Sequence, residues 1–127
     1  MTQSNKPEHL IYEQPKLMSR SELEQELASD DGERILSALI SAFYSEDPNW
    51  VQKSCLHLAT HKDGQARRAA AIVLGNVSGV HAKELNLMAS LETLYKLRTD
   101  HEEAVKTAAE DSIETVLHMI GQLKKHQ

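Results

Sequence analysis

Apolar side chains recur every three or four positions along most of the chain, which is the spacing that places them on one face of a helix. The stretch Ile35, Leu36, Leu39, Ile40 and Phe43 shows this pattern most clearly. Six helices are predicted in this way, joined by short connections, so consecutive helices must run antiparallel. They cover about residues 21–28, 33–44, 48–61, 64–79, 83–98 and 101–124. The predicted fold is therefore all-α, a short stack of antiparallel helix pairs.

Helix starts are marked by residues that can satisfy the first backbone N–H groups. Ser21 and Glu24 have the spacing of a capping box, which predicts a helix start near residue 21. Asp47 is a strong N-cap, and Pro48 suits the first helical position, where a backbone N–H has no partner. Residues 1–18 show no clear periodicity, so we expect a flexible N-terminal arm followed by one helical domain over residues 19–127.

One pattern occurs twice, at residues 63–75 and 102–113, with an offset of 39 residues. Each copy has a small and then a basic residue, a pair of alanines, and a large aliphatic residue. A period of this size among helices indicates stacked helix pairs. Such stacks usually bind partners along their surface and seldom carry catalytic machinery.

The amino-acid composition supports the all-helical prediction and indicates the cellular compartment. Aromatic residues make up only 4% of the chain, with five Gly and three Pro, which favours helices over strands. The sequence lacks an apolar stretch of membrane-spanning length and a basic-then-apolar leader, so we expect a soluble, cytoplasmic protein without membrane contact. The single cysteine, Cys55, cannot form an internal disulfide, which fits a reducing compartment.

Charge is distributed unevenly along the chain, whose net charge is −5. Residues 1–47 hold ten acids and four bases, whereas residues 48–99 have an excess of bases. Between residues 22 and 47, eight acids face a single base, Arg34. An acidic total disfavours phosphate binding, which needs clustered Lys and Arg, and is compatible with a basic protein partner.

Two segments carry a resemblance to a known family. Asp47-Pro48-Asn49-Trp50-Val51 looks like the opening of the first helix of a HEAT-like repeat, and residues 63–75 look like the second helix. The resemblance covers about residues 46–120, and it departs from the family at Ala66, where a larger aliphatic is usual. It implies a stack that binds proteins, with Arg67 at the position that commonly pairs with an Asp of a neighbouring repeat. In size, charge and architecture the chain also resembles bacterial immunity proteins, which inhibit toxins that are often nucleases.

Some histidines and the single cysteine are candidates for a metal site or for catalysis. His57 and His61 lie four apart on one predicted helix, but a metal site needs three or four ligands, and only His81 and His101 could be added. We expect surface and boundary histidines without a metal.

Cys55 could be a nucleophile, but it falls on the apolar stripe of its helix. We therefore expect it in the core and predict neither catalysis nor a cofactor.

Basic residues in the second half of the chain raise a nucleic-acid alternative, as in HEAT-like DNA glycosylases. The residues concerned are Arg67, Arg68, Lys96 and Arg98. Aromatic side chains for base stacking are scarce, and an ion pair to a neighbouring repeat is the simpler role for Arg67.

The hypothesis from sequence is a non-enzymatic protein-binding module, in its most concrete form an immunity protein that blocks the active site of a basic nuclease toxin. The alternatives are a general scaffold or regulatory adaptor and a nucleic-acid-binding protein. We expect the partner to contact the acidic N-terminal half, with Tyr44 or Trp50 as an aromatic anchor. The acids predicted for this contact are Glu22, Glu24, Glu26, Glu33, Glu46 and Asp47.

Overall fold

The computed structural model describes residues 17–125, and in this range it contains helices and no strand. The elements are α2 (Arg20–Leu27), α3 (Gly32–Ser45), α4 (Pro48–Leu58), α5 (Gly64–Val80), the short 3-10 helix η2 (Ala82–Glu84), α6 (Leu87–Leu97) and α7 (Glu103–Lys125). The all-α prediction is confirmed. The expected N-terminal arm lies outside the described residues, apart from its last two positions.

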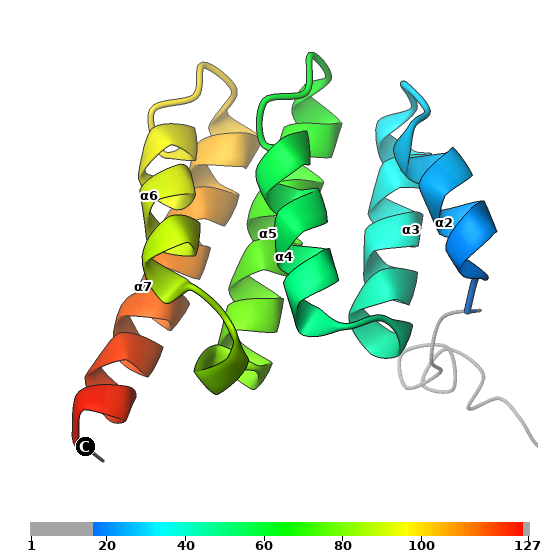
Figure 1. Ribbon diagram of the computed structural model, residues 1–127. Helices are drawn as coiled ribbons and strands as arrows, with labels where there is room; N and C mark the ends of the chain where they lie inside the picture. Colours follow the sequence, from blue (N-terminus) through cyan, green and yellow to red (C-terminus); the bar gives the residue numbers. More distant parts are fainter. Residues whose placement is uncertain (1–16, 126–127) are drawn as a thin grey trace, which may run out of the picture.

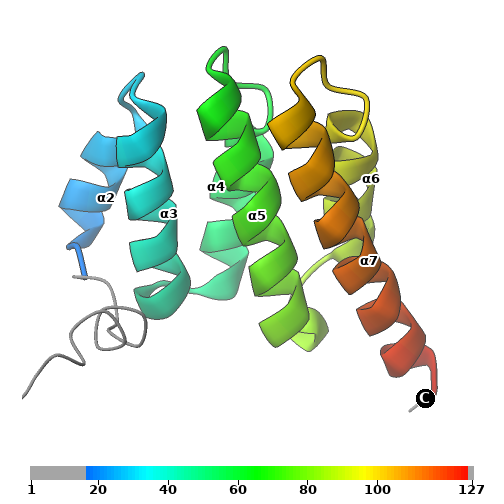
Figure 2. The ribbon, with the colours of Figure 1, turned by 180° about the vertical axis from the view of Figure 1, so that it is seen from behind.

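The helices form three antiparallel pairs, α2/α3, α4/α5 and α6/α7, which stand side by side (Figure 1). The second helices of the pairs, α3, α5 and α7, line one face of the stack (Figure 2). These second helices pack closely on one another, most extensively α5 on α7, whereas the first helices α4 and α6 contact each other only weakly. The predicted stack of helix pairs is therefore present, and its second-helix face is nearly continuous.

Local polar residues set where the helices begin. The side chains of Asp31, Asp47, Asp63 and Asn86 accept hydrogen bonds from backbone N–H groups in the first turns of α3, α4, α5 and α6. These groups have no partner inside the helix, so a side-chain acceptor stabilises each start by about 1 kcal/mol. The helix boundaries are therefore encoded close to where they occur.

The first helix begins at Arg20, one residue before its predicted start, and its capping box lies two residues earlier than predicted. The capping box joins Ser19 and Glu22 instead of Ser21 and Glu24. With this register Leu23 is fully buried, and the Met18 backbone N–H donates a 2.9 Å hydrogen bond to Ser41 Oγ on α3. Burial of Leu23 and this contact with α3 select between two capping boxes that the local sequence offers equally.

The helix predicted over residues 83–98 also begins later than expected. Residues Ala82–Glu84 form η2, and Asn86 Oδ1 then accepts a 3.1 Å hydrogen bond from the Ala89 N–H, so α6 begins at Leu87. Residues 59–60 form a turn in place of the predicted last helical turn to residue 61. The His61 N–H donates to the Leu58 carbonyl at 3.0 Å, and His61 Nδ1 accepts a 2.9 Å hydrogen bond from the Asp63 N–H.

Small residues on α5 allow the close packing at the centre of the stack. Ala70 is fully buried, and Ser112 Oγ on α7 donates a 2.7 Å hydrogen bond to the Ala71 carbonyl on α5. Gly75 lies against the same serine: a Cβ there would sit 2.7 Å from Ser112 Cβ. The absence of a side chain at Gly75 is thus required for the α5–α7 contact.

Candidate protein-binding surface

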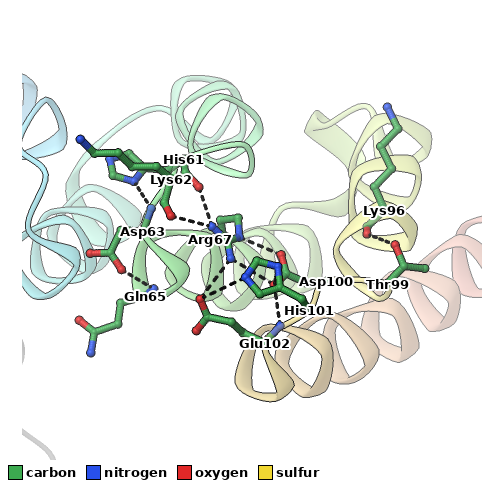
Figure 3. Close-up of polar contacts among 10 residues, drawn as sticks. All are labelled: His61, Lys62, Asp63, Gln65, Arg67, Lys96, Thr99, Asp100, His101 and Glu102. Atoms are coloured by element: carbon green, nitrogen blue, oxygen red, sulfur yellow. Dashed lines mark hydrogen bonds and ion pairs between the residues drawn. The ribbon is translucent and has the colours of Figure 1, made fainter.

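Arg67 on α5 links the loop before its own helix to the loop before α7 (Figure 3). Its guanidinium donates to Asp100 through Nε at 2.8 Å and to the His61 carbonyl through Nη1, also at 2.8 Å. The hydrogen bond between Arg67 and Asp100 raises the pKa of the arginine and lowers the pKa of the aspartate. The predicted ion pair to a neighbouring helix pair is confirmed, and it occupies one of the four basic residues on which the nucleic-acid alternative rests.

Most of the predicted N-terminal acids have partners within the helical domain. Glu22 Oε1 accepts a 2.9 Å hydrogen bond from the Ser19 N–H, and Asp47 caps α4. Two further acids form ion pairs, Glu26 with Arg34 at 2.7 Å and Glu46 with Arg20 at 2.6 Å. Glu24 and Glu33 are exposed, and their carboxylates have no hydrogen-bond or ion-pair partner among residues 17–125. The six acids therefore do not present a single uncompensated charge surface.

The two predicted aromatic anchors differ in accessibility. Trp50 on α4 is half-buried, and the guanidinium carbon of Arg20 lies 4.3 Å from its ring centroid. Tyr44 near the end of α3 is 51% exposed, with its ring packed edge-on against Phe43 at 5.1 Å. Tyr44 is thus available to a partner as it stands, whereas Trp50 is covered by Arg20. The partner contact at the six acids, Tyr44 and Trp50 stays a prediction.

The C-terminal helix carries acids that the sequence interpretation did not select. Glu110, Asp111 and Glu114 are exposed on α7, and their carboxylates have no partner within residues 17–125. Glu103 lies on the same helix, and its Oε1 is 3.8 Å from Lys106 Nζ. These acids could have been selected from the sequence, because they are concentrated on the polar face of the predicted helix over residues 101–124. The interpretation favoured the N-terminal half instead, since its excess of acids is larger.

A groove of about 490 Å³ runs between α5 and α7 beside these acids. Its lining combines apolar or small side chains with charged ones on both sides: Arg68, Ile72, Glu103, Ala104, Thr107, Ala108 and Asp111. The groove lies between the two second helices that pack most closely, and Figure 2 shows these helices side by side on the second-helix face. It therefore offers an accessible apolar floor bordered by uncompensated charge.

Exposed apolar side chains also occur at the α6/α7 end of the stack. Met88 is 63% exposed and lines, with Tyr95, a hollow of about 430 Å³ on α6. A second hollow of about 410 Å³ lies between the η2 region and the end of α7, where Val80 is 64% exposed.

Candidate catalytic and metal-binding residues occupy ordinary structural positions. Cys55 is fully buried, and this burial raises the pKa of its thiol. His57 is exposed, whereas His61 caps the turn before α5. Residues 17–125 contain no group of three or more His, Cys, Asp or Glu side chains placed to hold a metal ion. In the same range, no helix has both the length and the apolar character needed to cross a membrane.

No family model matches the chain, and no curated protein matches it significantly. Among solved structures, it is similar to a chain in the crystal structure of a CDI complex from Cupriavidus taiwanensis LMG 19424. The TM-score is 0.70 at 27% sequence identity, and the match covers 85% of this chain and 96% of that chain. The similarity therefore extends over nearly the whole of the other protein, while the HEAT-like resemblance stays an interpretation of the repeat pattern.

Proposed function

We propose that this chain is a non-enzymatic immunity protein, which binds a cognate toxin and keeps it inactive by direct contact. The observation that carries the proposal is the similarity to a chain of a CDI complex over 96% of that chain's length. CDI complexes belong to toxin–immunity systems. A protein of the same fold and size that is found in such a complex supports a toxin-binding role for this one.

The architecture is suited to inhibition by coverage. Stacked helix pairs present an extended surface without needing a catalytic centre. The Arg67–Asp100 pair and the helix caps hold the loops in place, so little conformational freedom is lost when a partner binds. A chain with a net charge of −5 also attracts a basic partner over long distances. We therefore propose a nuclease toxin, because a nuclease must carry basic groups to bind phosphates.

Arg67 weakens the nucleic-acid alternative. Its side chain is only 10% exposed and is bonded to Asp100 and to two backbone carbonyls, so it cannot reach a phosphate without breaking these contacts. Arg98 lies over the ring of Tyr95 at 4.8 Å, which occupies one of the few aromatic rings that could stack on a base. No comparable observation favours a general adaptor over a toxin inhibitor.

Co-expression tests the proposal. The chain is produced in a host cell together with the toxin domain encoded immediately beside its gene, and an unrelated nuclease toxin serves as the control. We expect the cognate domain to co-purify with the chain and the cells to survive, whereas the control toxin is neither bound nor blocked. Failure to bind the cognate domain, together with cell death, would reject the immunity role and leave an adaptor with another partner.

A further inference from the structure

We propose that the groove between α5 and α7 is the docking site for the toxin, and that it takes a basic segment with an apolar side chain at its centre. This inference rests on the proposed function and adds the surface and the chemistry of the segment that binds there. The apolar side chain would enter the groove, and flanking Lys or Arg side chains would meet the carboxylates of α7.

The shape of the groove supports an apolar anchor. Ile72 on α5 and Ala108 on α7 lie at its lining with the small residues Ala104 and Thr107, so the space between the helices is not filled by their own side chains. A volume of about 490 Å³ falls within the range of roughly 300–1,000 Å³ that holds small ligands. One large side chain with part of its backbone fits such a space, and burial of an aliphatic or aromatic group there removes water from both surfaces.

The charges around the groove specify a basic partner. Asp111 lines the groove, and Glu110 and Glu114 lie on the outer face of the same helix, all three without a partner within residues 17–125. Uncompensated acids near an apolar groove accelerate encounter with a basic surface and suppress binding of acidic partners. Arg20 and Arg34 each pair with one of the N-terminal acids, whereas Glu110, Asp111 and Glu114 have no pairing base within residues 17–125.

Arg68 gives the groove a direction. It lines the groove from α5, opposite the acids of α7, and its guanidinium has no partner within residues 17–125. A partner segment must therefore present basic groups toward α7 and a carboxylate or carbonyl oxygen toward Arg68. The positive charges of an entirely basic peptide would repel Arg68. The groove therefore favours a folded segment with mixed charge over a simple polylysine tract.

The groove is also preformed. Ser112 ties α7 to the Ala71 carbonyl, and Arg67 ties the start of α5 to the loop before α7. These contacts fix the separation of the two helices along the groove. A site that needs no rearrangement loses little entropy on binding, which favours a tight complex.

Two double variants with the same change in charge test the electrostatic half of the inference. Glu110→Lys/Glu114→Lys alters α7, and Glu24→Lys/Glu33→Lys alters the N-terminal half, where both carboxylates are also exposed and have no partner within residues 17–125. Association with the cognate toxin domain is measured by stopped-flow at low and high salt, after melting curves show that both variants are folded. We expect the α7 variant to associate about tenfold more slowly at low salt, and the N-terminal variant to stay close to the parent.

A second pair of variants tests the anchor. Ala104→Phe fills the groove, and Ser37→Phe adds the same ring to an exposed position on α3 outside it. We expect about tenfold faster dissociation of the toxin domain from Ala104→Phe alone, as for the loss of one well-packed anchor. If the parent does not bind the toxin domain at all, the proposed function fails. If the parent binds and the variants on α7 behave like their matched controls, the groove is not the docking site.

Discussion

Arg67 and Asp100 are 33 positions apart in the chain, and their side chains meet through two hydrogen bonds, Nε to Oδ2 at 2.8 Å and Nη2 to Oδ1 at 3.2 Å. Both side chains are only 10% exposed. The pair connects the second helix pair of the stack to the third, beside the groove between α5 and α7. The geometry of that groove therefore depends on this contact.

Removal of the Arg67 side chain should destabilise the fold strongly. In Arg67→Ala, Asp100 loses its main partner while it remains largely buried, and the free energy of unfolding should fall by about 3 kcal/mol. Arg68→Ala is the matched control, because Arg68 is the next residue on the same helix but is exposed; its effect should stay within about 0.5 kcal/mol. Urea unfolding of both variants measures the difference, and equal effects would show that the ion pair contributes nothing to stability.

The same pair predicts how stability depends on pH. The hydrogen bond from Arg67 lowers the pKa of Asp100 in the folded protein, so the unfolded chain takes up a proton at this position first as the pH falls. The contribution of Asp100 is complete above the ordinary aspartate pKa of about 3.9 and disappears as the pH falls below it. Urea unfolding of the parent and of Asp100→Asn should differ clearly at about pH 6 and converge toward about pH 3. A constant difference over this range would contradict the assignment.

Two glycines in helices should respond in opposite ways to the same substitution. Gly75→Ala places a methyl group against Ser112 on α7, within 3.1 Å of its backbone Cα, and should cost about 1–3 kcal/mol. Gly121→Ala meets no atom within 4 Å, and should stabilise α7 by up to about 1 kcal/mol because alanine favours helix. Thermal melting of the two variants checks the prediction, and a stabilising Gly75→Ala would mean that α5 and α7 are farther apart than described.

Cys55 should react only when the protein unfolds. The thiol is fully buried and its pKa is raised by that burial, so both access and thiolate formation are suppressed in the folded state. Labelling with a disulfide reagent should be slower in buffer than in denaturant by about a thousandfold or more. Rapid labelling of the native protein would place Cys55 at the surface and would reopen the possibility of a reactive cysteine.

Helix positions could be predicted from the sequence because their determinants are local. Asp31, Asp47 and Asp63 lie directly before the helices they cap, and the apolar stripes have a fixed period. The errors occurred where tertiary contacts choose between local alternatives, as at Ser19, whose helix start is selected by burial of Leu23.

The charge of a surface was harder to predict, since it depends on which side chains meet across helices. A count of acids and bases between residues 22 and 47 omits Arg20, yet Arg20 pairs with Glu46, 26 positions away, and covers Trp50. The motif around Arg67 was more informative, because the repeat resemblance predicted an Asp partner in a neighbouring repeat. No such rule existed for the groove, which arises only when α5 and α7 are packed together.

Titration of toxin activity tests the central claim most directly. Increasing amounts of the chain are added to a fixed concentration of the cognate toxin domain, well above the dissociation constant, and residual toxin activity is measured. A non-enzymatic inhibitor that acts by coverage predicts a linear fall that reaches zero at one equivalent. Activity that is unchanged in excess chain would contradict toxin binding, and inactivation far below one equivalent would show that the chain acts as an enzyme.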